Sequence, residues 1–164
     1  MYYEEVFRSL DIYGVRYIVV GGVALVLHGV VRMTADLDLI IEMDDENITA
    51  FLSAMKQLGY QPKIPVSLDD FADAEKREQW RSEKGLEVFS LLHPEQTMKT
   101  IDVFVYEPID YHELDTEKEM ASAVGMTIPY VSLRHLKQLK SMSGRKQDIA
   151  DIEALERLKD LERE

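Results

Sequence analysis

The residues best suited to chemistry are two aspartates, Asp36 and Asp38, in the stretch ADLDLIIE. Side chains two apart in a β-strand point to the same face, so a strand here places both carboxylates together. Like charges that close repel each other unless a cation lies between them. Hard divalent cations such as Mg2+ take carboxylate oxygens and share them with substrate phosphates. The pattern therefore predicts a metal and phosphate site, and the alternative is one turn cap and one solvated aspartate.

Two further features could complete such a site. Gly21 and Gly22 follow an apolar run, and glycine lets the backbone approach a ligand closely before a following helix. The same pair is also an ordinary turn sequence. Asp102 lies between Ile101 and Val103, and an inward-facing carboxylate there needs a partner or a cation. The alternative for Asp102 is an outward-facing position on an edge strand.

The charge pattern limits the binding partners. A net charge of -12 argues against extended DNA binding, which requires a basic face. However, residues 12–35 and 130–147 contain no acid, and the second segment carries Lys140 and Arg145. These two cations could hold one small anion, or they could lie on a solvated helix face.

Length and composition favour one α/β domain spanning residues 1–164, with a helical pair over 131–164. The chain has no cysteine, which excludes disulfides and a thiolate nucleophile. Its four histidines are scattered, so we expect no zinc site, and we expect His28 to be a core residue. No apolar run is long enough for a membrane span, and the acidic N-terminus is unlike a signal peptide, so we expect a cytoplasmic protein.

Periodicity and end signals predict a mixed sheet flanked by helices. Residues 107–119 are acidic and fit neither pattern. We interpret Val23–His28 as a short buried helix, with a strand as the alternative for so short an apolar run. The apolar stripe of the last helix is expected to pack in the core, with any exposed part available for a homodimer. Trp80 is expected to pack as well. The expected helices begin near Tyr3, Asp44, Ser67 and Ser132, and a last helix carries the stripe from Ile149 to Leu161. The expected strands are 17–20, 37–42, 88–92, 100–106 and two pieces within 120–131.

Together these features resemble the nucleotidyltransferase superfamily, which includes DNA polymerase β and the antibiotic nucleotidyltransferases. The family signature is a Gly-Gly or Gly-Ser turn, a spaced acidic pair and a third acid on a neighbouring strand. Arg32-x-Thr34-x-Asp36-x-Asp38 resembles the small bacterial branch with the abortive-infection and toxin–antitoxin enzymes. So does the run from Leu136 through Lys140, Gly144 and Arg145 to Asp148 and Asp151. Many active members have Gly-Ser where this chain has Gly21-Gly22.

The resemblance implies an α+β fold and Mg2+- or Mn2+-dependent transfer of NMP from an NTP to a hydroxyl. Catalytic and metal-binding roles fall on Asp36, Asp38 and Asp102. Nucleotide and phosphate binding falls on Gly21, Gly22, Arg32, Thr34, Lys140 and Arg145. The acceptor could be a small molecule, a protein or an RNA end.

Two other functions stay open. The chain could be a binding component of a toxin–antitoxin-type pair that contacts a partner protein, in which case the acidic segment 107–119 would suit a basic surface. It could also be an α/β domain with coincidental aspartates, and then Asp102 would lie far from Asp36 and Asp38.

Overall fold

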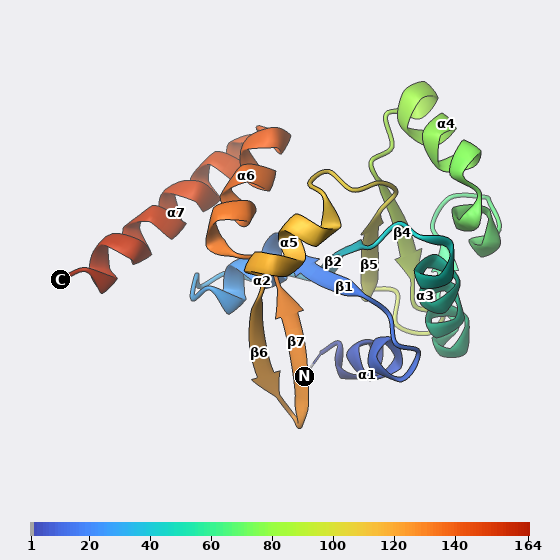
Figure 1. Ribbon diagram of the computed structural model, residues 1–164, viewed down its shortest axis with the longest axis horizontal. Helices are drawn as coiled ribbons and strands as arrows, with labels where there is room; N and C mark the ends of the chain where they lie inside the picture. Colours follow the sequence, from blue (N-terminus) through green and yellow to red (C-terminus); the bar gives the residue numbers. More distant parts are fainter. Residues whose placement is uncertain (1) are drawn as a thin grey trace.

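The computed structural model describes residues 2–164 and is organised around one mixed β-sheet (Figure 1). The strands are β1 Tyr17–Val20, β2 Asp36–Ile41, β3 Gln61–Pro62, β4 Val88–Leu92, β5 Thr100–Phe104, β6 Glu119–Ala123 and β7 Met126–Tyr130. Their order in the sheet is β3-β4-β5-β2-β1-β7-β6. The predicted mixed sheet is confirmed, and the two aspartates lie on its central strand.

The helices lie around this sheet. They are α1 Glu4–Ile12, α2 Gly21–Leu27, α3 Asp45–Leu58, the 3-10 helix η1 Leu68–Ala72, α4 Ala74–Lys84, α5 Tyr111–Glu117, α6 Leu133–Ser143 and α7 Lys146–Glu162. Figure 1 shows α6 and α7 together on the side away from α3 and α4, with the C-terminus at the outer end of α7. No helix within residues 2–164 combines the length and apolarity that crossing a membrane requires.

In the central strands, apolar residues that favour β-structure alternate with polar residues. In β2, Leu37 and Leu39 are fully buried on either side of Asp38. In β5, Ile101 and Val103 are fully buried on either side of Asp102. Because alternate residues face opposite sides of a sheet, burying the leucines, isoleucine and valine turns every aspartate to the other face. The core thus fixes the direction of the carboxylates.

The structure corrects one local expectation and defines two other segments more closely. The segment 67–80 forms two helices rather than one, because the Asp73 side chain accepts hydrogen bonds from the backbone N–H of Glu75 and Lys76 and starts α4 anew. The acidic segment contains the short helix α5. The apolar run after Val20 is a helix, as interpreted, and it begins at Gly21, whose left-handed φ of 66° makes the turn out of β1.

The last helix packs differently from the prediction. Of its apolar stripe only Leu155 is fully buried, whereas Ile149 is 53% and Leu161 is 66% exposed. The other buried positions of α7 are Asp148 and Asp151. Buried carboxylates require charged or hydrogen-bonding partners, and these come from α6 and from the segment before β2. Trp80 packs as expected, with its ring 5.1 Å from that of Phe89.

Candidate active site

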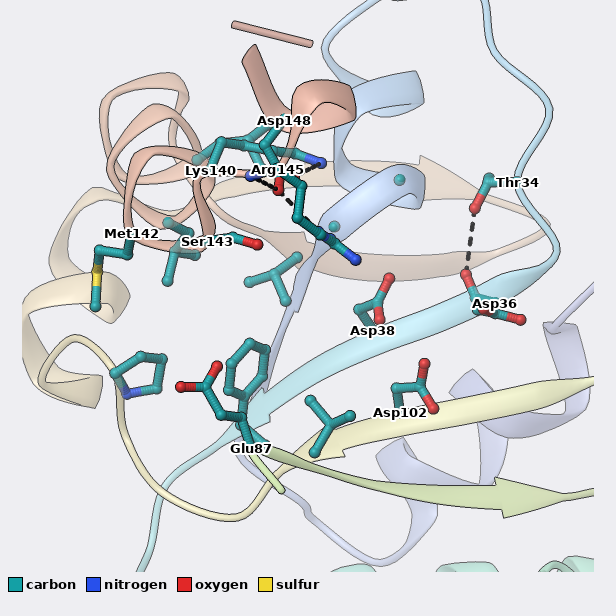
Figure 2. A pocket seen from close by; sticks show the side chains of 18 of the residues that line it. Thr34, Asp36, Asp38, Glu87, Asp102, Lys140, Met142, Ser143, Arg145 and Asp148 are labelled. Carbon is teal, nitrogen blue, oxygen red and sulfur yellow. Dashed lines mark hydrogen bonds and ion pairs between the residues drawn. The ribbon is translucent and has the colours of Figure 1, made fainter. Parts of the chain in front are cut away.

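The floor of the candidate site consists of two adjacent strands that each carry an aspartate. β2 and β5 run parallel, and their register places Asp38 directly beside Asp102. Asp36 lies two residues earlier on the same face of β2, at its exposed end. Figure 2 shows the Asp38 and Asp102 carboxylates on the same side of the sheet. Asp102 is therefore on an inner strand beside Asp38, which contradicts the edge position and the wide separation that the coincidental-aspartate alternative expects.

The start of α2 fits closely around this floor. Gly21 has the left-handed φ of 66°, and a Cβ there would lie 2.2 Å from Asp38 Oδ2. A Cβ on Gly22 would lie 2.6 Å from Thr34 Oγ1. Both distances are shorter than real Cβ contacts, so a side chain at either position would require Asp38 or Thr34 to move. The Thr34 hydroxyl occupies the space that a Gly22 side chain would enter.

The electrostatics of the floor favour a bound cation. Burial raises the pKa of Asp38 to about 7, helped by the charges of Asp102 and Asp36, and a backbone hydrogen bond from Gly22 opposes the shift. Burial also raises the pKa of Asp102, against a 2.6 Å hydrogen bond from the Ser90 hydroxyl. Carboxylates that raise each other's pKa are stabilised when a positive charge comes between them.

The donor set fits a hard divalent cation. All three candidate ligands offer carboxylate oxygens, which Mg2+ and Mn2+ prefer. Within residues 2–164 no three acidic or histidine side chains are already drawn together as a closed metal centre. Asp36 stands apart at the exposed end of β2, so Asp38 and Asp102 are the pair on which the fit depends.

The opposite wall carries the predicted cations, which are joined through two buried acids. Lys140 Nζ lies 2.8 Å from Asp151 and 3.5 Å from Asp148. Arg32 Nη1 lies 2.6 Å from the same Asp151 oxygen, and Arg145 Nε lies 2.9 Å from Asp148. Lys140, Asp148 and Asp151 are all nearly buried, so the solvated-face alternative is wrong for Lys140. Arg145 is different, because its side chain is 75% exposed and points toward Asp38 (Figure 2).

All the predicted site residues line one cleft of about 620 Å³, a volume typical of small-molecule sites. Sequence reasoning missed the part of the cleft beyond Asp102, because its members come from separate segments and follow no motif. They are Glu87, Val88, Phe104, Tyr106, Pro108, Leu139 and Met142. Outside the cleft, His28 is structural as expected, with Nε2 2.8 Å from the Val131 carbonyl oxygen.

A central strand with paired carboxylates, a glycine-led helix beside it and an acid on the parallel neighbour is the layout expected of a nucleotidyltransferase. Comparison with solved structures confirms that the chain has the nucleotidyltransferase fold. The sequence itself matches no protein-family model and no curated protein.

Three of these structures show how far the likeness extends. The lincosamide antibiotic adenylyltransferase LnuA, solved with lincomycin bound, matches with a TM-score of 0.58 at 18% identity, over 93% of this chain and 95% of that one. The antibiotic-resistance factor ANT(2'')-Ia gives 0.61 at 13% identity, over 94% and 80%. TM1012 of Thermotoga maritima, a candidate nucleotidyltransferase, gives 0.57 at 17% identity, over 91% and 86%. At these identities the likeness concerns the fold.

Proposed function

We propose that this protein transfers the nucleotidyl group of an NTP to the hydroxyl of an acceptor, with Mg2+ or Mn2+. The observation that carries this proposal is the in-register pair of Asp38 and Asp102 at the floor of a cleft whose opposite wall is cationic. The fold supports the same reaction class.

In the proposed reaction the acceptor oxygen attacks the α-phosphorus, the bond from that phosphorus to the bridging oxygen breaks, and pyrophosphate leaves. The proton of the acceptor hydroxyl passes to a carboxylate of the floor or to water. Asp102 is the better placed base, because the Ser90 hydroxyl donates a hydrogen bond to one of its oxygens and so fixes the carboxylate. Asp36, Asp38 and Asp102 would hold the divalent cation, which supplies charge neutralisation at the phosphates.

The cationic wall binds the triphosphate in this proposal. Arg145 is the most exposed cation and points over Asp38, so it can move onto a phosphate at little desolvation cost. Arg32 and Lys140 share Asp151, which holds both side chains at the cleft. The Thr34 hydroxyl, packed against Gly22, is available to donate to a phosphate oxygen where related enzymes use serine.

The test uses ATP labelled with 32P at the α- or the γ-phosphate, with Mg2+ and lincomycin among a panel of hydroxyl-bearing small molecules. Lincomycin is included because it is bound in the LnuA structure. We expect the α-label on an acceptor and the γ-label in pyrophosphate. Transfer of the γ-label to an acceptor would mean phosphoryl transfer and would contradict the proposal.

No observation within residues 2–164 specifically supports the alternative that the chain is a binding component. The acidic segment proposed for a basic partner is largely used within the chain. Glu107 accepts hydrogen bonds from the backbone N–H of Met43 and of Tyr111. Glu117 pairs with Arg134 at 2.5 Å, and Asp115 pairs with Lys118 at 2.5 Å.

A further inference from the structure

The part of the cleft beyond Asp102, here termed the acceptor end, has a chemistry opposite to that of the cationic wall. It consists of Glu87, Val88, Phe104, Tyr106, Pro108, Leu139 and Met142. Figure 2 shows Glu87 on this side of Asp102, with its carboxylate pointing into the cleft and Met142 across from it. A phosphate would be repelled from this end by the Glu87 charge.

The aromatic side of the acceptor end is fixed before any ligand binds. The rings of Phe104 and Tyr106 lie 6.1 Å apart at 63°, which makes an edge-to-face corner. Arg81 stacks on Tyr106 with its guanidinium carbon 3.6 Å from the ring centroid. Tyr106 also lines a second, smaller hollow that contains Arg81, so Arg81 covers the Tyr106 ring from outside the cleft and restricts its movement.

Among the side chains that line the acceptor end, only Glu87 is charged. Glu87 is exposed, and within residues 2–164 it forms no ion pair. Its one side-chain contact there is a 3.4 Å hydrogen bond that Oε1 accepts from the Tyr106 hydroxyl. Asp148 and Asp151, by contrast, are neutralised by cations of the wall. A carboxylate beside an aromatic corner and apolar side chains is an environment that binds an organic ammonium group.

We infer that the acceptor end binds a cationic acceptor: a small hydroxyl-bearing amine with an apolar or aromatic body, its ammonium group at Glu87 and its hydroxyl at Asp102. This inference rests on the proposed function. The strand register supports the spacing, since the Glu87 carbonyl accepts a hydrogen bond from Val105 N–H, three residues beyond Asp102. At the rise of an extended strand that separation is roughly 10 Å, the length of a small aromatic amine with its two polar groups at opposite ends.

The test compares two probes of the same shape, tyramine and 2-(4-hydroxyphenyl)ethanol, which differ by ammonium against hydroxyl. Their binding to the full chain is measured by calorimetry for wild type, Glu87→Gln and Glu83→Gln. Glu83 is an exposed residue of α4 outside the cleft, so its variant is the control for lost charge. We expect wild type and E83Q to bind tyramine about threefold to tenfold more tightly than the neutral probe. We expect E87Q to lose that preference.

Equal binding of the two probes by wild type, or an undiminished preference in E87Q, would overturn the inference. A second measurement excludes the nucleobase as the occupant. E87Q should keep the wild-type affinity for each Mg2+-bound NTP, and a changed nucleotide preference would assign Glu87 to the base instead. Failure of the proposed function is distinguishable, because it removes NTP binding in wild type while the tyramine comparison still reports on Glu87.

Discussion

Asp38 and Asp102 are direct neighbours across the parallel strands β2 and β5, and each carboxylate is held on the cleft side by the buried residues that flank it. Neither aspartate has a cation paired with it in the described chain. Their arrangement stores unfavourable charge that a divalent cation relieves. Repulsion between the two carboxylates therefore lowers the free energy of unfolding of the metal-free protein.

The first prediction concerns that stored charge. Asp38→Asn should raise the free energy of unfolding of the metal-free protein by roughly 2–4 kcal/mol at pH 8, since one pKa unit corresponds to about 1.4 kcal/mol. The Asp38 pKa is raised to about 7 in the folded state, so ionisation opposes folding above its ordinary value near 3.8. The gain should therefore shrink as the pH is lowered toward 4. Urea unfolding of EDTA-treated protein at several pH values measures it.

With Mg2+ present, the order of stability of wild type and Asp38→Asn should reverse. Saturating Mg2+ raises the melting temperature of wild type, because it binds only the folded state, and leaves Asp38→Asn unchanged. An equal Mg2+ response in both proteins would show that the cation binds elsewhere.

A second prediction tests the close approach of α2. Gly21→Ala should cost roughly 2–5 kcal/mol, because the left-handed φ is strained for alanine and the methyl group would overlap Asp38. Gly85→Ala is the matched control, since Gly85 has a φ of 62° and nothing within 4 Å of the added carbon. It should lose only the backbone part, about 1–2 kcal/mol. Similar losses in both variants would contradict the tight contact.

A third prediction concerns Gly22, which stands where many active nucleotidyltransferases have serine. Gly22→Ser should destabilise the protein, because the serine Cβ would lie 2.6 Å from Thr34 Oγ1. Adding Thr34→Ala should restore part of the loss, with an interaction energy on the order of 1–2 kcal/mol. Thermal or urea unfolding of the four members of this double-mutant cycle gives the value. Strict additivity would mean that the Thr34 hydroxyl does not occupy the space of the absent serine side chain.

A fourth prediction uses the acid that joins the two cations of the C-terminal pair. Burial tends to raise the pKa of Asp148, but hydrogen bonds from Arg145 and Ser143 outweigh it and lower the pKa to about 2. The ionised side chain therefore contributes stability at neutral pH, and that contribution is lost as the pH falls from about 4 to 2. Asp148→Asn should lose about 2 kcal/mol at pH 7 and nothing at pH 2. Asp160→Asn, at an exposed position of α7, should show no such difference.

The sequence was sufficient for the parts that local patterns determine. Alternation in β2 predicted that Asp36 and Asp38 share a face, and end signals such as Asp44 and Gly59 predicted the bounds of α3. For Asp102, alternation alone favoured an outward-facing edge position, and the pairing of β5 with β2 places it beside Asp38 instead. It was misleading for α7, where the apolar stripe suggested a core face. The buried face instead follows Asp148 and Asp151, because ion pairs with Lys140 and Arg32 compensate their desolvation.

The acceptor end could not be predicted from the sequence at all. Glu87 precedes one strand and Tyr106 follows another, and only the antiparallel pairing of β4 with β5 brings them together. The pairing of distant strands is a tertiary property that no local period encodes. Thr34 was a predicted site residue, but its contact with Gly22 is likewise a tertiary feature that the sequence does not show.

The central claim is that Asp38 and Asp102 hold a metal-bound nucleoside triphosphate. Calorimetric titration of each of the four NTPs into the protein, with Mg2+, with Mn2+ and with EDTA, tests it most directly. We predict that wild type binds at least one NTP only with metal, and that Asp38→Asn and Asp102→Asn lose this binding while both variants remain folded. Absence of metal-dependent NTP binding in wild type, or full retention of it in both variants, would contradict the account.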